Sequence, residues 1–254
     1  MEPVLIEDHG AVRVITINRP ERRNAVNALT AAALRDAWLA LEADDRVSVG
    51  VLTGGDDVFC AGADLSDIEG LAAELEGPNG PLGFTRLTVL RKPTIAAVAG
   101  YAVAGGLELA CWCDLRIADE SAVFGCFERR FGVPLVDGGT QRLPRIVGLG
   151  RALDMILTGR AVDAAEAHII GLANEIVSQG QHVQRAIELG LQLAEFPQMC
   201  MRNDRQAVYD GLGHDLQTGL RLEAGLGLVT IRSGESRAGA MRFMRGEGRS
   251  GSGA

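Results

Sequence analysis

The feature that most constrains the fold is the alternation of short apolar runs with helical segments in the first half of the chain. An amphipathic helical pattern from about Asn27 to Ala43 follows the first run. Val12–Ile17 alternates and stops at Asn18-Arg19-Pro20, and Val47–Leu52 is closed by Thr53-Gly54-Gly55, so we interpret the runs as strands. Strands alternating with helices predict an α/β layered architecture. The expected strands are 12–17, 47–52, 94–98, 115–118, 123–125 and, in the more helical second half, 173–177.

The charge balance excludes several kinds of partner. The 254-residue chain has a formal net charge of −8. Such a field repels nucleic acid and anionic lipid, so a phosphate-bearing ligand needs a local basic cluster. The N-terminal segment lacks the basic and long apolar regions of a signal peptide, and no run of about 18 apolar residues occurs. We therefore expect a cytoplasmic protein with no nucleic-acid or membrane partner.

Cysteine and histidine usage indicates no metal site and no disulfide framework. The five cysteines make an odd count without a Cys-x-x-Cys pair, and the four histidines are scattered. Free cysteines are among the most buried residue types, so we expect all five to fill the core.

Two loops of small residues share one design. Ala61–Asp64 and Ala104–Glu108 each follow a strand and lead into a helix. Small residues let a ligand approach backbone N–H groups, and amides at two helix starts can converge on one oxygen that gains negative charge. Neither loop is Gly-x-Gly-x-x-Gly or a P-loop sequence, so a dinucleotide or nucleotide site is not indicated.

Two acids are candidates for catalysis with these loops. Glu108 has a simple interpretation as a solvated residue favoured by the helix dipole, and an alternative one as a catalytic acid. Glu128 lies 20 residues further along the chain (128 − 108). It has a simple interpretation as a surface residue paired with Arg129 or Arg130, while two carboxylates beside an oxyanion hole would form an acid and base pair about a bound water.

Several linked motifs, in register over about residues 12–177, resemble the crotonase superfamily and specifically the enoyl-CoA hydratases. They are Asn18-Arg19-Pro20, Asn24-Ala25, Phe59–Leu65, Lys92-Pro93-x-Ile-Ala-Ala-Val-x-Gly-Tyr-Ala, Gly105-Gly106-x-Glu108-Leu109, Cys113-Asp114, Phe124-Gly125 and Gly138-Gly139-Thr140-Gln141-Arg142-Leu143-Pro144.

The resemblance implies a fold and an assembly. The fold would be a spiral of ββα units over residues 1–195, which holds the active site. A C-terminal helical region, 196–245, would pack neighbouring copies into homotrimers, often paired as hexamers. We expect two helices between 215 and 244, broken at Ser233-Gly234, and a flexible tail at 246–254, which is rich in Gly and Ser.

The resemblance also implies a reaction. The substrate would be an acyl-CoA thioester, with no metal or redox cofactor beyond the CoA of the substrate itself. The N–H groups of Ala63 and Gly105 would bind its carbonyl oxygen, and Glu108 and Glu128 would hold the water that adds across the 2,3-double bond. The CoA-binding residues implied by the resemblance are Ala25, Ala61, Arg23 and Lys92. The candidate phosphate ligands are Arg22, Arg23 or Lys92, and each can also be a solvated surface charge.

The chain departs from the hydratase pattern between residues 129 and 137. Val136 stands where a glycine is expected, and it would reshape the pocket. Asp137 stands near the place where dienoyl-CoA isomerases carry a catalytic Asp, and it is also a good N-cap for a helix starting at Gly138. Two alternatives to the hydratase thus stay open: an enoyl- or dienoyl-CoA isomerase with the same oxyanion hole, and a catalytically silent acyl-CoA-binding relative.

Overall fold

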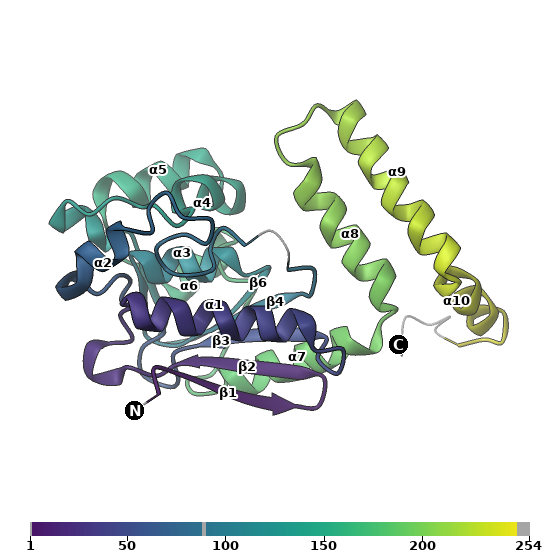
Figure 1. Cartoon of the computed structure of the whole chain (residues 1–254), viewed down its shortest axis with the longest axis horizontal. Coiled ribbons are helices and arrows are strands. Elements are labelled where there is room, and N and C mark those ends of the chain that lie inside the picture. Colours follow the sequence, from purple (N-terminus) through teal and green to yellow (C-terminus); the bar gives the residue numbers. More distant parts are fainter. Residues whose placement is uncertain (1, 88–89, 248–254) are drawn as a thin grey trace.

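A six-stranded sheet forms the centre of the fold in the computed structural model, which describes residues 2–87 and 90–247. Its strand order is β1-β2-β3-β4-β6-β9, with β1 and β2 antiparallel and the other pairs parallel (Figure 1). A smaller sheet has the order β5-β7-β8. The strands are β1 Val4–His9, β2 Val12–Ile17, β3 Val49–Thr53, β4 Thr94–Val98, β5 Tyr101–Val103, β6 Leu115–Asp119, β7 Val123–Gly125, β8 Val162–Asp163 and β9 Glu175–Val177.

Helices occupy most of the remaining described chain and confirm the predicted α/β class. Asn27 caps the first helix by accepting a hydrogen bond from the Thr30 N–H, as expected for an Asn at this position. The helices are α1 Ala28–Ala43, α2 Ile68–Ala72, α3 Gly105–Trp112, α4 Gly139–Val147, α5 Leu149–Thr158, α6 Ala164–Ile169, α7 His182–Glu195, α8 Gln198–Gly211, α9 Leu216–Ser233 and α10 Glu235–Met244, with 3-10 turns η1 Pro20–Arg22, η2 Leu65–Asp67 and η3 Phe127–Phe131.

The parallel strands are apolar on both faces because helices cover both. Val51 and Ile95 pack with Ile187 of α7 on one face. Their neighbours Leu52 and Ala96 belong to the larger core that includes α1 and α3 on the other face. Successive side chains of a strand point to opposite faces, so a strand buried on both sides becomes a continuous apolar run.

Two successive units repeat the same path. After β4 in the large sheet the chain enters β5 in the small sheet and then α3; after β6 it enters β7, then η3 and α4. Each unit therefore contributes one strand to each sheet before its helix. This repetition is the predicted spiral of ββα units, and it brings the start of α3 and the η3 segment to the same side of the fold.

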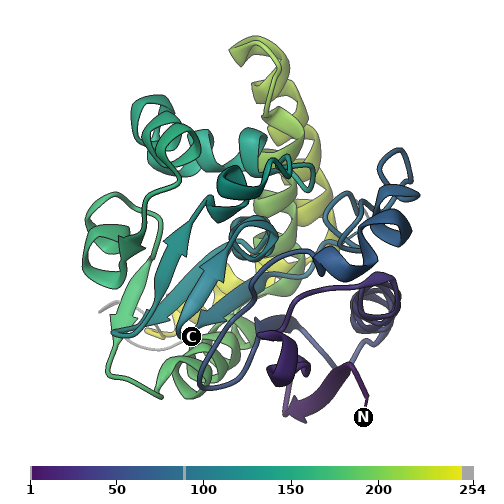
Figure 2. The ribbon, with the colours of Figure 1, turned by 90° about the vertical axis from the view of Figure 1, so that its left-hand side faces the viewer.

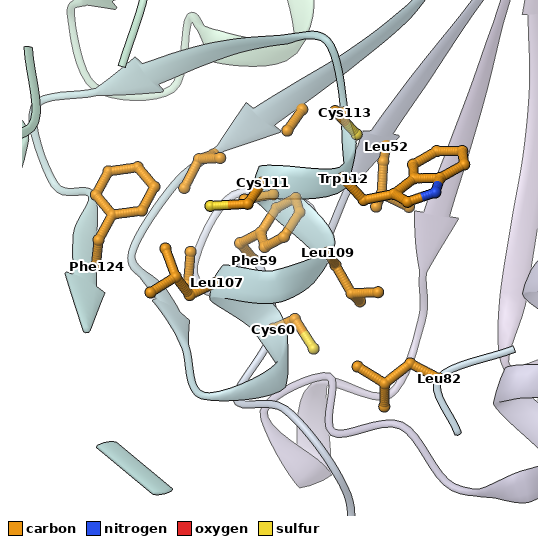
Figure 3. Packing of buried hydrophobic residues seen from close by; sticks show 14 of the residues in the cluster. Leu52, Phe59, Cys60, Leu82, Leu107, Leu109, Cys111, Trp112, Cys113 and Phe124 are labelled. Carbon is orange, nitrogen blue, oxygen red and sulfur yellow. The ribbon is translucent and has the colours of Figure 1, made fainter. Parts of the chain in front are cut away.

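Helix α3 lies at the centre of the larger core. All eight of its residues are buried, and Trp112 packs edge-on against Phe84 with ring centroids 4.7 Å apart. Figure 3 shows Leu107, Leu109 and Cys111 projecting from this helix into the surrounding apolar side chains. Four of the five cysteines are buried as expected, whereas Cys200 is partly exposed on α8, so the core prediction is wrong for that residue.

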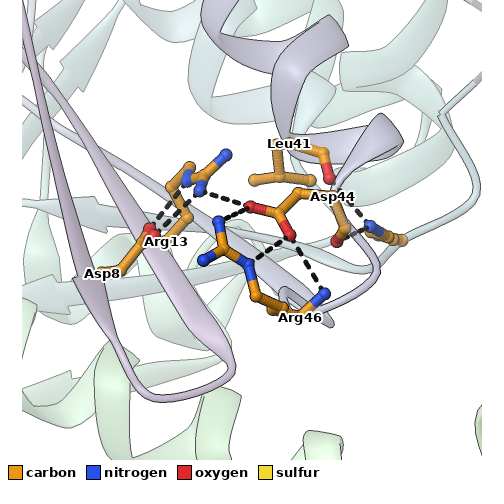
Figure 4. A network of polar contacts seen from close by, with 6 residues as sticks. Asp8, Arg13, Leu41, Asp44 and Arg46 are labelled. Atoms are coloured by element: carbon orange, nitrogen blue, oxygen red, sulfur yellow. Dashed lines mark hydrogen bonds and ion pairs between the residues drawn. The ribbon is translucent and has the colours of Figure 1, made fainter.

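The hairpin of β1 and β2 is tied to the end of α1 by charged side chains. Arg13 donates to Asp8 at 2.7 Å and to Asp44 at 2.9 Å, and Arg46 also pairs with Asp44 (Figure 4). These arginines hold the pKa of the Asp44 carboxyl well below its usual range. Strand β1 has no counterpart among the predicted strands, because most of its side chains face solvent and its apolar residues, Val4–Ile6, do not alternate with polar ones.

Helices α8 and α9 lie side by side and extend beyond the sheet, with α10 folding back at the end of α9 (Figures 1 and 2). Gly234, at a φ of 91°, separates α9 from α10, which confirms the predicted break. Buried Asn203 donates to Thr230 at 2.9 Å between α8 and α9. Residues 248–254 of the predicted tail lie outside the described residues.

Candidate active site

A cavity of about 340 Å³ lies beside the start of α3. Its wall is almost entirely apolar, and its acidic side chains are Glu108, Glu128 and Asp137. The wall is built from Ala61–Leu65, the α2 region, Pro81 and Leu82, the start of α3, and residues of η3 and the following segment up to 137. Three carboxyl groups in an apolar cavity are costly to bury, so they mark a functional-site candidate.

The first small-residue loop is held by a parallel bridge to Val26. The Val26 N–H donates to Gly62 O at 2.8 Å, and the Asp64 N–H donates to Val26 O at 2.8 Å. In this pattern the bonds of Val26 flank Ala63, so the Ala63 N–H points away from Val26. Ala63 lines the cavity, and within the described part of the chain its N–H has no hydrogen-bond partner.

The second small-residue loop enters α3 through a strained residue. Ala104 has a φ of 54°, which is rare for a residue with a Cβ and costs on the order of 1–3 kcal/mol. Gly105 follows as the first residue of α3, where a backbone N–H has no partner within the helix. The strained turn thus presents the Gly105 amide and the positive end of the helix dipole to the cavity.

The two loops meet so closely that side chains would block them. A Cβ added to Gly105 would lie 3.4 Å from the Ala63 nitrogen, and one added to Gly62 would lie 2.7 Å from the Gly105 nitrogen. Glycine at these positions lets both amides approach one point. The geometry suits two donors that converge on one oxygen.

Glu108 is buried rather than solvated, which rules out its simple interpretation as a surface residue at a helix start. It is 2% exposed, and its Oε1 accepts from the N–H of Gly139 at 2.7 Å and of Asp137 at 2.9 Å. Burial is the largest cause that raises the pKa of Glu108, to about 8, with the charges of Asp137 and Glu128 adding to the rise.

Glu128 is also buried, and within the described residues it forms no ion pair with Arg129 or Arg130, the pairing of its simple interpretation. Arg129 donates to Ile156 O, and Arg130 donates to Gly159 O while it stacks on the Phe127 ring. Within the described residues neither carboxyl oxygen of Glu128 has a hydrogen-bond partner, although both are buried. Burial raises the pKa of Glu128. A buried carboxyl group without a partner that lines a cavity is suited to bind a ligand or water.

The segment that departs from the hydratase pattern forms one wall of the cavity. Val136 lines the cavity, as expected for a residue that reshapes it. Asp137 does not cap α4: the cap residue is Gly138, without a side-chain hydrogen bond. The Asp137 carboxyl turns instead to the 80–85 segment, where it accepts from Leu82 N and Thr85 Oγ1. The N-cap prediction is therefore wrong.

The predicted CoA contacts divide into two groups. Ala61 lines the cavity, and its N–H donates to Arg23 O, which places exposed Arg23 and half-buried Ala25 beside the first loop. Lys92 lies elsewhere, 2% exposed, and its ammonium donates to Leu41 O and Asp44 O at the end of α1. A buried ammonium bonded in this way caps the helix, so the structure does not bring Lys92 to the site.

Leu82 and Pro81 are site residues that the motifs do not indicate. They come from residues 77–83, a segment rich in Gly and Pro, a composition typical of a loop, yet Leu82 is buried against Gly105. An apolar Leu among glycines and prolines is the sequence signal that could have indicated a buried position in this loop. Over residues 2–87 and 90–247, no three His, Cys, Asp or Glu side chains gather as metal ligands, and no helix is long and apolar enough to cross a membrane.

Comparisons with known proteins agree over nearly the whole chain. The family model described as enoyl-CoA hydratase/isomerase matches residues 7–248. A probable enoyl-CoA hydratase of Rhizobium meliloti is 38% identical over 96% of this chain and 95% of its own, and a short-chain-enoyl-CoA hydratase of Clostridium acetobutylicum is 39% identical over 87% and 86%. The crystal structure of an enoyl-CoA hydratase from Mycobacterium marinum superposes with a TM-score of 0.90 at 34% identity, covering 96% of both chains.

Proposed function

Because the chain belongs to the enoyl-CoA hydratase/isomerase family, we propose that it is an enoyl-CoA hydratase, which adds water across the 2,3-double bond of an enoyl-CoA thioester. The observation that carries the proposal is the pair of buried carboxyl groups, Glu108 and Glu128, in one cavity with the Ala63 and Gly105 amides, which have no hydrogen-bond partner among the described residues. An apolar wall around them suits an unsubstituted hydrocarbon acyl chain.

The amides of Ala63 and Gly105 bind the thioester oxygen in this proposal. Negative charge develops on that oxygen as the double bond is attacked, and donors that are already oriented stabilise it without reorganisation. Removal of one such donor typically costs about 10²–10³-fold in kcat. The dipole of α3 acts in the same direction because its first turn faces the oxygen.

Glu108 and Glu128 hold the attacking water between them. One carboxylate takes a proton from the water as its oxygen bonds to C3, and the other carboxyl gives a proton to C2. No electrons are exchanged with a cofactor, so the reaction needs none. The pKa of Glu108, which burial raises to about 8, supports a proton on that carboxyl near neutral pH, and burial also raises the pKa of Glu128.

For the CoA portion we assign contacts to Ala25, Ala61 and Arg23. Ala61 belongs to the first loop, half-buried Ala25 lies beside it, and the carbonyl oxygen of exposed Arg23 accepts from the Ala61 N–H. An exposed arginine suits phosphate because its guanidinium donates in a planar fork.

We also propose that the chain forms homotrimers or hexamers through its C-terminal helices. Exposed apolar side chains follow α9, which isolated soluble helices rarely present, and they include Leu216, Leu220, Val229 and Ile231. Sedimentation of the parent and of Leu220→Glu tests the assembly, and an unaltered molar mass in the variant would contradict the assignment of the surface.

The activity is tested by following the loss of the conjugated thioester absorbance with crotonyl-CoA. Glu108→Gln and Glu128→Gln should each lower hydration by about 10²–10⁴-fold, the usual contribution of a positioned acid or base. A parent enzyme that fails to hydrate crotonyl-CoA but isomerises a 3-enoyl-CoA would overturn the proposal in favour of the isomerase.

A further inference from the structure

Asp137 connects two parts of the cavity wall that are far apart in sequence. The residue is 3% exposed, and its Oδ1 accepts from Thr85 Oγ1 at 2.5 Å and from Leu82 N at 3.1 Å. The neighbouring guanidinium of Arg142 donates to the Asp137 carbonyl oxygen rather than to this carboxyl group. The Asp137 side chain thus accepts both of its hydrogen bonds from one turn of the chain, residues 80–85.

That turn closes tightly on the carboxyl group. Gly80 has a φ of 82°, and a Cβ there would lie 2.9 Å from Asp137 Oδ1 and 2.5 Å from Thr85 Oγ1. A side chain at Gly80 would therefore push the two partners apart. The close approach indicates that the position of the turn depends on the Asp137 carboxyl.

The backbone of the same residue holds Glu108. The N–H groups of Asp137 and Gly139 both donate to Glu108 Oε1, which leaves Oε2 as the oxygen without a hydrogen bond within the described residues. Glu108 lines the cavity, so the orientation of the peptide at 137–139 decides which carboxyl oxygen is free for proton transfer.

The turn held by Asp137 also supports the oxyanion donors. Leu82 is 1% exposed, and its Cδ1 would lie 2.8 Å from a Cβ at Gly105. Displacement of Leu82 would remove the packing behind the Gly105 amide. Asp137 thus contacts the carboxyl group of Glu108 through its backbone N–H and holds the wall behind Gly105 through its side chain.

We propose that Asp137 is a positioning residue for the hydration reaction, which tethers the Gly80–Thr85 turn and the 137–139 peptide against Glu108 and Gly105, and that it transfers no proton itself. The inference rests on the proposed hydratase function. It follows from the geometry that the acceptor oxygen, and not the negative charge, is what the site requires from this residue.

Asp137→Asn and Asp137→Ala separate the two roles. The Asn side chain keeps an oxygen that accepts from Leu82 N and Thr85 Oγ1 but cannot shuttle a proton, whereas Ala removes the tether. With crotonyl-CoA, we expect Ala to lower kcat by about 10²-fold, the scale of a roughly 1 Å misplacement, with KM changed by less than about threefold. Asn should restore kcat to within about threefold of the parent.

Thr85→Val and Thr85→Ser provide an independent pair if Asp137→Ala does not fold. Val removes one donor to Oδ1 and should lower kcat by about tenfold, the equivalent of one hydrogen bond, and Ser should retain it. Urea unfolding of every variant shows whether the fold persists.

The outcomes are distinct. A parent without hydratase activity contradicts the proposed function. An active parent in which Asn is as impaired as Ala, or in which Ala and Thr85→Val equal the parent, overturns the positioning role alone.

Discussion

The amide of Gly139 donates to Glu108 Oε1 at 2.7 Å, across 31 residues of sequence, and the Gly139 Cα leaves no space for a side chain beneath that carboxyl. A Cβ at Gly139 would lie 2.9 Å from Glu108 Cγ and 3.0 Å from Oε1. The start of α4 therefore packs directly against the Glu108 carboxyl group and hydrogen bonds to it.

Gly139→Ala should lower hydratase activity with the fold preserved. The added methyl group displaces the Glu108 carboxyl, and a misplacement of about 1 Å can cost 10²-fold in rate. Steady-state kinetics with crotonyl-CoA and urea unfolding measure the two effects. Gly150→Ala is the matched control, because it also lies at a helix start and a Cβ there meets nothing within 4 Å. Equal kcat in both variants would contradict the prediction.

Gly62→Ala should impair the oxyanion donors. Its Cβ would lie 2.7 Å from the Gly105 nitrogen, and loss of one donor costs about 10²–10³-fold in kcat. The φ of 98° at Gly62 adds strain for any L-residue. Gly213→Ala is the control, since its φ of 88° is similar but a Cβ there is in open space. If Gly62→Ala keeps the parent kcat, the assignment of the Ala63 and Gly105 amides fails.

The stability advantage of Glu108→Gln should grow as the pH rises. Below about pH 4.5 the carboxyl group is protonated in the folded and the unfolded chain, whereas between 4.5 and its folded pKa of about 8 only the unfolded chain ionises. Ionisation of the unfolded chain lowers the free energy of unfolding across this window, by about 1.4 kcal/mol per pKa unit. Gln is neutral at every pH, so this ionisation does not lower the free energy of unfolding of Glu108→Gln.

Urea unfolding of the parent and of Glu108→Gln at pH 5 and pH 8 measures this difference. Titrating groups that do not interact with Glu108 are common to both proteins and cancel in the comparison. A difference in unfolding free energy that is the same at both pH values would show that Glu108 does not titrate as its burial requires.

Lys92→Met should destabilise the fold without weakening substrate binding. The ammonium bonds to Leu41 O and Asp44 O, so its loss leaves carbonyl groups at the end of α1 unpaired, at a cost of about 1–3 kcal/mol. Arg23→Ala should do the reverse and raise KM for crotonyl-CoA by about two- to fivefold, as for an exposed ion pair. A raised KM in Lys92→Met would restore that residue as a phosphate ligand.

Much of the fold was predictable because its signals are local. The strands at 12–17, 94–98 and 123–125 coincide with β2, β4 and β7, because short segments rich in β-branched and apolar residues that end at turn residues indicate strands. Asn27 caps α1 by bonding to the backbone of Thr30, and Gly234 ends α9 by its own backbone conformation, so both signals depend only on residues close in sequence. Strand β1 was missed because the side chains of an exposed edge strand need not be apolar or alternate with polar ones.

Pairings between distant segments were not predictable. Sequence allowed Glu128 to pair with Arg129 or Arg130, and allowed Asp137 to cap α4, because both partners lie close along the chain. The structure turns the two arginines to Ile156 O and Gly159 O and turns Asp137 to the 80–85 segment. Residues adjacent in a 3-10 turn point in different directions, so proximity in sequence does not decide their contacts.

By itself, the sequence determined the layered α/β class, the two small-residue loops and the candidate acids, since glycine spacing and apolar periodicity follow from local backbone sterics and burial. Only the tertiary structure decided that Glu108 is buried on the amides of Asp137 and Gly139, that Glu128 has no partner within the described chain, and that Lys92 caps a helix. Desolvation and hydrogen bonding depend on what the rest of the fold places within a few ångströms of a side chain.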